Sequence, residues 1–234
     1  MVRCVLLSVA LCWTASAAGA SNAVSLGYSD KGAVIDSDAE SCPGGGWLVA
    51  NHDGTFENGY AWQYAGIQPP YYGAFGEGIE GFQWTVACVA LWVSTEPGYF
   101  SGQTCDVYIW DGGVDSPPTS VLGMVAGVVL GNVPVWPMCG ENDVWINMGV
   151  HGDFTVGYWG NWPGGHAAYY CGADLSGSGG HPWTWIAPGV GYPTGWNDPS
   201  IVWGPTRSMG CGAWFAHPAS VEARSWGSIK ALFE

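Results

Sequence analysis

Basic residues are scarce in this sequence, and their scarcity excludes a large class of functions. The chain holds 5 Lys and Arg against 19 Asp and Glu, which gives a formal net charge of −14. Nucleic-acid binding needs a cationic surface that displaces counterions from the phosphates. We therefore expect no nucleic-acid partner, and we expect the surface to repel anionic membranes as well.

Charged residues of both signs and long apolar runs are also few. Charged residues make up 10% of the chain, against about one quarter in ordinary domains. After residue 20 no run approaches the ~18 apolar residues of a membrane-spanning helix. Helical bundles need Ala, Glu, Lys and Leu, whereas this chain has 38 Gly and 16 Trp. A hydrophobic content of 48% nevertheless suffices to bury a core, which argues against disorder.

The first 20 residues have the pattern of a secretory signal peptide. Arg3 is the positive charge of a short n-region, and residues 4–13 form an apolar run that is too short to span a bilayer. Small residues follow, and both 15–17 and 18–20 fit an A-x-A cleavage site. We therefore expect residues 1–20 to be removed and the protein to be secreted or held at the cell surface, with no membrane span.

Export would place the remaining cysteines in an oxidising compartment. Six cysteines follow residue 20: Cys42, Cys88, Cys105, Cys139, Cys171 and Cys211. An even number in a secreted chain predicts up to three disulfides, so we expect no more than one or two free thiols. The spacing does not choose among the pairings, and no CxxC motif indicates a zinc or redox site.

Short alternating segments between Gly- and Pro-rich turns predict an all-β fold. In residues 82–93 the even-numbered positions are expected to share one face, and in 105–110 Val107 and Ile109 alternate with Tyr108 and Trp110. Further strands are expected at 144–150, 154–158, 167–171, 183–187, 200–203 and 211–215. This pattern is typical of an antiparallel, jelly-roll-like β-sandwich.

The chain divides into one domain and two short flanking segments. Residues 21–46 are polar and are expected to form a leader or edge strand, and residues 47–217 to form the β-sandwich domain. Residues 218–234 are expected to be a tether and a short amphipathic tail. Trp226, Ile229 and Phe233 have helical spacing there, but so short a helix needs to dock on the domain or on a partner.

Three segments carry a resemblance to a known kind of module. Residues 51–62, with an Asp-Gly-x-x-Glu opening, resemble the start of β-sandwich modules of uncharacterised secreted bacterial proteins. Residues 107–118, a strand followed by Asp-Gly-Gly and a Pro-rich turn, are similar to a second feature of these modules. The tail at 221–233, with Trp-Gly-x-Ile-Lys, resembles the tails of exported proteins. The resemblance implies a jelly-roll-like fold and a secreted location, and it implies no reaction.

Catalytic motifs do not stand out. The sequence has no G-x-S-x-G motif, and its five histidines are widely spaced. The close carboxylate pairs are Asp53 with Glu57 and Glu77 with Glu80. Glycines at 76, 78 and 81 predict a loop around the second pair, in which the carboxylates are solvated or cap the loop. We expect no catalytic residue.

The segment 51–58 has two interpretations, a calcium site or a turn. Asp53 and Glu57, with Thr55 and nearby carbonyls, supply the oxygen ligands that calcium prefers. The alternative is an Asx turn that enters a strand. We expect no cofactor other than this candidate calcium.

Tryptophan is the most unusual component of the sequence. Six lie between residues 159 and 203: Trp159, Trp162, Trp183, Trp185, Trp196 and Trp203. Flat indoles can stack on sugar rings, so the first five are candidates for a glycan-binding platform. The alternative is that these rings pack in the core.

Three functions follow from these patterns, in order of preference. The first is a non-catalytic secreted or cell-surface module with a structural, assembly or adhesive role, whose partners are neighbouring subunits or a surface glycan. The second is a carbohydrate-binding module that uses the aromatics of 159–203. The third is a glycan-active enzyme.

Overall fold

The computed structural model describes residues 23–29, 34–36, 42–62, 73–98, 102–161 and 169–216. The predicted signal peptide, Trp162 and the predicted tail at 218–234 lie outside these residues. Within them the chain is nearly all strand, so the prediction of an all-β, antiparallel fold is confirmed.

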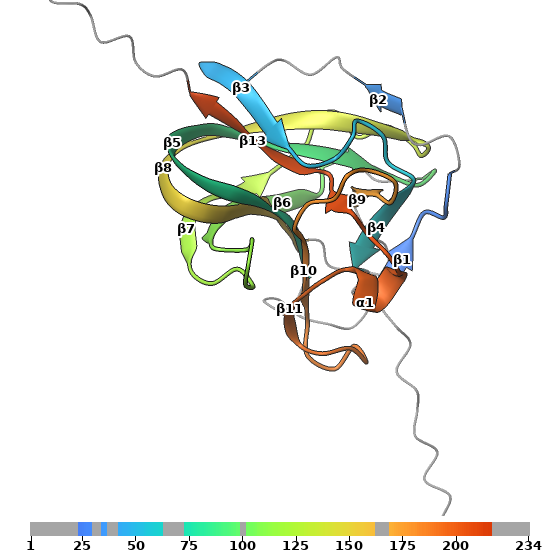
Figure 1. Cartoon of the computed structure of the whole chain (residues 1–234). Coiled ribbons are helices and arrows are strands. Elements are labelled where there is room, and N and C mark those ends of the chain that lie inside the picture. The colour runs from blue at the N-terminus through green and yellow to red at the C-terminus, as the bar shows by residue number, and fades with distance from the viewer. Residues whose placement is uncertain are drawn as a thin grey trace, which may run out of the picture.

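The described elements are 13 strands and one helical turn (Figure 1). They are β1 (Ala23–Ser25), β2 (Val34–Asp36), β3 (Gly45–Ala50), β4 (Asn58–Trp62), β5 (Ala74–Ser94), β6 (Thr104–Asp111), β7 (Val121–Val128), β8 (Met138–Asn161), β9 (Tyr170–Asp174), β10 (Pro182–Ile186), β11 (Gly195–Asn197), α1 (Ser200–Trp203), β12 (Ser208–Met209) and β13 (Cys211–Ala216).

Two long strands organise the sheet. β5 has 21 residues and β8 has 24, and they pair antiparallel along almost their whole length. Figure 1 shows both strands bending together, so the sheet is curled. The first half of β5 lies between β8 and β10, and its second half lies between β8 and β13. The main strand order is β1-β4-β9-β5-β8-β6-β7.

The main hydrophobic core collects side chains from both halves of this curled sheet. Phe75, Val107 and Phe154 come from the half that contains β6, whereas Leu91 and Phe215 come from the half that contains β13. All five are at most 1% exposed. The alternation predicted for 105–110 is confirmed, because Cys105, Val107 and Ile109 belong to the core.

A β-bulge overturns the predicted alternation of residues 82–93. The register of β5 against β8 shifts between Val86 and Cys88. Val86 and Val89 therefore both face the main core, whereas Ala90 and Trp92 belong to a separate cluster on the other face. One extra residue in a strand reverses the face of every residue after it.

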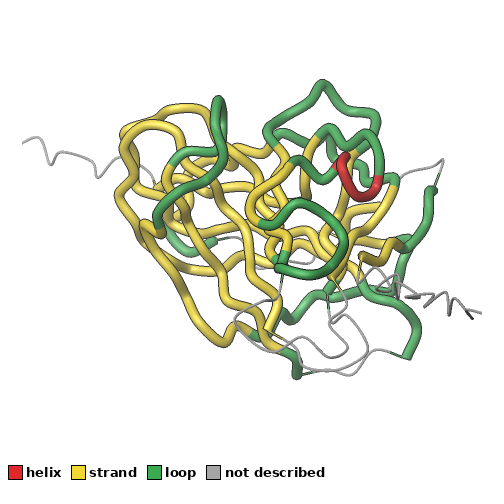
Figure 2. Tube along the Cα trace, turned by 90° about the horizontal axis from the view of Figure 1, so that it is seen from below, coloured by secondary structure: helices red, strands yellow, loops and turns green. Residues whose placement is uncertain are grey.

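Two further expectations from the sequence are wrong. Residues 76–81, predicted to be a glycine-rich loop, lie inside β5. Residues 200–203, predicted to be a strand, form the helical turn α1, whose start is tied by the Asp198 side chain to the Ser200 N–H at 2.8 Å. Figure 2 shows how strands make up most of the described trace, with α1 as its one helical turn.

The predicted leader segment 21–46 contributes short strands to the sheet. β1 pairs with β4 at one end of the strand order, and β2 pairs in parallel with the start of β8. Among the described residues, no helix is long and apolar enough to cross a membrane.

Candidate functional site

Three of the candidate tryptophans lie in one row across the sheet. Trp159 of β8 is opposite Ala74 of β5, which is opposite Trp185 of β10, which is opposite Trp196 of β11. The neighbouring residues Tyr158, Thr184 and Ile186 are buried. Side chains alternate along a strand, so the three tryptophans occupy the outer face of this half of the sheet.

The rings of this row join two more from β6 into one cluster. Ring centroids lie 5.6 Å apart for Trp159 and Trp185, and 5.8 Å apart for Trp185 and Trp196. Trp196 is also 4.9 Å from Trp110, which stacks on Tyr108 at 4.9 Å. Tyr108 and Trp159 close the circuit at 6.4 Å. We call these five residues (Tyr108, Trp110, Trp159, Trp185 and Trp196) the aromatic face.

Small residues form the floor under the aromatic face. Ala74 separates Trp159 from Trp185 in the row, and Gly76 pairs with Gly157 in the next row. A Cβ at Gly76 would lie 2.8 Å from the Thr155 methyl and 3.7 Å from the Trp110 ring. A side chain at Gly76 would crowd Thr155, and one at Gly157 would clash with the Phe75 carbonyl, so packing requires both glycines.

The aromatic face is partly open to solvent. Tyr108, Trp159, Trp185 and Trp196 are half-buried, and Trp110 is 3% exposed. Burial and the nearby Asp106 carboxylate raise the pKa of Tyr108, so its hydroxyl stays neutral. The five side chains of the face therefore present uncharged indole and phenol surface.

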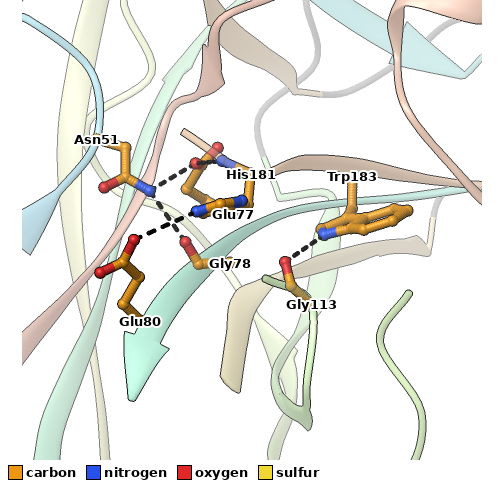
Figure 3. Close-up of polar contacts among 7 residues, drawn as sticks. All are labelled: Asn51, Glu77, Gly78, Glu80, Gly113, His181 and Trp183. Carbon is orange, nitrogen blue, oxygen red and sulfur yellow. Dashed lines mark hydrogen bonds and ion pairs between the residues drawn. The ribbon is translucent and has the colours of Figure 1, made fainter. Parts of the chain in front are cut away.

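The other candidate tryptophans take different roles. Trp183 lies one row along from Trp185, and its indole N–H donates to the Gly113 carbonyl at 2.6 Å (Figure 3). Trp203 stacks on Tyr60 at 4.6 Å and packs against the core, as the core interpretation expected. Trp162 lies outside the described residues.

Sequence reasoning missed Tyr108 and Trp110 as members of the face. The pattern that could have found them was present, because the alternation of 105–110 places both on the side opposite Val107 and Ile109. What the sequence does not contain is the pairing of β6 with β8 that brings them beside Trp159.

A buried carboxylate positions the strand that carries Trp183 and Trp185. Glu77 of β5 is 0% exposed. One of its oxygens accepts the Asn51 amide at 2.8 Å and the His181 N–H at 2.6 Å (Figure 3). The other accepts the Met209 N–H at 2.7 Å. Glu77 thus joins the end of β3, the start of β10 and β12.

The glycine-rich segment before β10 is shaped by this carboxylate. A Cβ at Gly180 would clash with the Glu77 carboxylate and with Asn51. His181 follows, and its N–H is held by Glu77 while its ring lies 3.9 Å from the exposed Glu80 carboxylate. Of the two expected roles, solvated or loop-capping, Glu77 does not take the solvated one: it is buried and accepts backbone N–H groups, whereas Glu80 is exposed.

Burial raises the pKa of Glu77 to about 8, although its three N–H donors act in the opposite direction. Burial lowers the pKa of His52 to about 4. Between pH 4.5 and 8 the folded state holds a proton on Glu77 that the unfolded chain has released, so stability falls as the pH rises. His52 has the opposite effect. Between pH 4 and 6.5 the unfolded chain holds a proton on His52 that the folded state has released, so stability rises as the pH rises.

Above pH 6.5, His52 is neutral in both the folded and the unfolded chain, so of these two groups only Glu77 still changes the free energy of unfolding. We expect the free energy of unfolding to fall by about 2 kcal/mol between roughly pH 6.5 and 8. Urea denaturation of wild type and Glu77→Gln across this range measures it, and the variant should lack this slope. Equal slopes in the two proteins would assign the dependence to another group.

Of the two candidate calcium residues, Glu57 is buried and Asp53 is exposed. Both oxygens of Glu57 accept internal donors: the Leu175 N–H at 2.7 Å, the Ser176 hydroxyl at 2.9 Å and the Thr55 hydroxyl at 3.2 Å. Asp53 accepts the Thr55 N–H at 2.9 Å, as the Asx-turn alternative expects. An ion at Asp53 and Glu57 would have to displace these donors, and calcium stays a prediction.

The cysteines pair less than the sequence predicted. Cys42 and Cys88 form a disulfide, whereas Cys105, Cys139, Cys171 and Cys211 are free and buried. The expectation of at most two free thiols is therefore wrong. The free thiols serve as small apolar side chains, three of them in the main core. Burial raises the pKa of Cys105, Cys139 and Cys211, which keeps them unreactive.

Comparisons with protein-family models, with curated proteins and with solved structures found no match for this chain.

Proposed function

We propose that this protein is a secreted, non-catalytic module that adheres to neutral glycans through the aromatic face. The observation that carries the proposal is the joining of Tyr108, Trp110, Trp159, Trp185 and Trp196 into one partly exposed cluster on four strands. These rings are brought together from residues up to 88 positions apart (196 minus 108).

The chemistry of the face suits an uncharged ligand with apolar patches. Indole rings offer flat surface for the C–H faces of sugar rings, and an extended apolar area that remains solvent-accessible on a folded domain marks a binding site. The chain has a net charge of −14, which disfavours acidic polysaccharides and nucleic acids. The uncharged aromatic surface and the acidic chain together favour a neutral glycan as the ligand.

The arrangement of the face is rigid, which favours binding over a packing role alone. Trp159 and Trp185 stand on paired strands rather than on loops, and Glu77 fixes the start of β10 through the His181 N–H. Binding residues held by strands lose little conformational freedom when a ligand arrives.

Trp185→Ala tests the proposal on a neutral-glycan array with intrinsic tryptophan fluorescence. We expect the variant to bind about tenfold or more weakly than wild type, because truncating a central aromatic anchor removes most of its contact surface. Trp145→Ala is the matched control, since Trp145 is 50% exposed and belongs to the other half of β8. Equal affinity of both variants and wild type, or no binding to any neutral glycan, would refute the proposal.

A further inference from the structure

One edge of the sheet is long, apolar and open. β7 lies at the end of the strand order, and among the described residues β6 is the strand hydrogen-bonded to it. Its eight residues exceed the three of β1 and β11 and the six of β3. The outer backbone edge of such a strand is a template for pairing with another chain.

Exposed apolar side chains gather along this edge. Val121 is 54% exposed, Leu122 37% and Met124 48%. Val129, directly after the strand, is also exposed. Charged side chains and Pro, which blunt many natural edge strands, do not occur in β7.

The distribution of charge favours a second copy of this chain as the partner of this edge. No Asp, Glu, Lys or Arg occurs between residues 116 and 140, in a chain whose net charge is −14. Two copies of so acidic a protein can approach closely only where both surfaces lack acids. Asp106, on the neighbouring strand, lies at the far end of β7, where it accepts the Gly127 N–H at 2.8 Å.

We infer that β7 pairs antiparallel with β7 of a second copy, which joins the two sheets across a twofold axis near Met124. The register against β6 is regular from Gly123 to Val125 and shifts on either side, so the straight part of the edge is centred on Met124. A self-complementary strand of this kind gives a closed, isologous dimer.

The dimer has a consequence that rests on the proposed function. Met124 is opposite Tyr108 across the β6–β7 pair, so the edge continues the aromatic face. A twofold axis perpendicular to the joined sheet keeps both aromatic faces on the same side. Two sites on one rigid body would bind a repeating glycan with avidity.

Sedimentation of the full chain without any glycan tests the dimer independently of glycan binding. We expect wild type to dimerise at protein concentrations up to about 100 μM at physiological salt, and Met124→Lys and Met124→Glu each to raise the dissociation constant about tenfold or more. The Met124 side chain is largely exposed, so both variants should keep the wild-type melting temperature. Ile201→Lys, at an equally exposed apolar position on α1, should dimerise like wild type.

Mixing the two Met124 variants gives the decisive measurement. Lys and Glu meet across the proposed axis in the mixture, so an equimolar mixture should dimerise again, whereas each variant alone stays monomeric. A wild type that is monomeric at every concentration would overturn the inference. So would Met124 variants that dimerise like wild type, or a mixture that fails to recover.

Discussion

Glu77→Ala is expected to lower the free energy of unfolding by about 3–5 kcal/mol. The substitution removes the acceptor of three donors: the backbone N–H groups of His181 and Met209, and the Asn51 amide, which also donates to the Gly78 carbonyl at 2.9 Å. Glu77 is 0% exposed, so bulk solvent does not contact its side chain in the folded protein. Each donor left without a partner costs about 1–3 kcal/mol, which is a large share of the stability of a domain.

Two further substitutions separate the anchoring role from a general effect of losing an acid. Glu77→Gln keeps one oxygen for Asn51 and His181 but turns an amide group toward the Met209 N–H, so we expect an intermediate loss of about 1–3 kcal/mol. Glu80→Ala removes an exposed carboxylate three residues along the same strand and should change stability by less than about 0.5 kcal/mol.

Urea denaturation near pH 7, monitored by tryptophan fluorescence, ranks the three variants. The same experiment probes the aromatic face, since the Glu77 carboxyl group holds the start of β10. A Glu77→Ala protein as stable as Glu80→Ala would show that the carboxylate is not an anchor and that β10 is held by its strand pairing alone.

Local patterns predicted the fold class and parts of the sheet correctly. The alternation of 105–110 assigned Val107 and Ile109 to the core, because side chains on a strand alternate strictly while the register is regular. The same rule failed in 82–93, where the bulge between Val86 and Cys88 changes the face. A bulge depends on the partner strand, and no local pattern of hydrophobicity reveals it.

Glycine misled the prediction where tertiary packing required it. Gly76 and Gly78 suggested a loop, but both lie within β5. A Cβ at Gly78 would clash with the Gly113 carbonyl, and one at Gly76 would crowd Thr155. These glycines are needed because another part of the backbone or a side chain packs directly against β5 at these positions. Such a tertiary contact cannot be predicted from the local sequence.

The candidate site was predictable in part for the same reason. Abundance of tryptophan between 159 and 203 pointed to Trp159, Trp185 and Trp196, which the structure brings together. Their partners Tyr108 and Trp110 arrive through the pairing of β6 with β8. Glu77 is held by His181 and by Met209 of β12, which are far away in the sequence. Strand pairing over such distances is set by the whole core and not by local sequence.

Removing the Cys42–Cys88 disulfide is expected to cost about 4 kcal/mol, since it closes a loop of 46 residues. The loop contains β3, β4 and most of β5, so the crosslink restricts a large part of the unfolded chain. Both cysteines are buried against Ala87 and Trp214, and Cys42→Ala/Cys88→Ala keeps that site apolar. A loss of this size should lower the melting temperature by roughly 8–16 °C.

Cys171→Ala/Cys211→Ala is the matched control, because these sulfurs lie 3.9 Å apart without a bond. Reductant should lower the melting temperature of wild type and of this control alike, and it should leave the Cys42→Ala/Cys88→Ala protein unchanged. The control itself should lose less, since it removes two small buried groups and no crosslink. If reductant instead acted on the Cys42→Ala/Cys88→Ala protein and not on the control, the stabilising crosslink would join Cys171 to Cys211, in the core beneath β9 and β13.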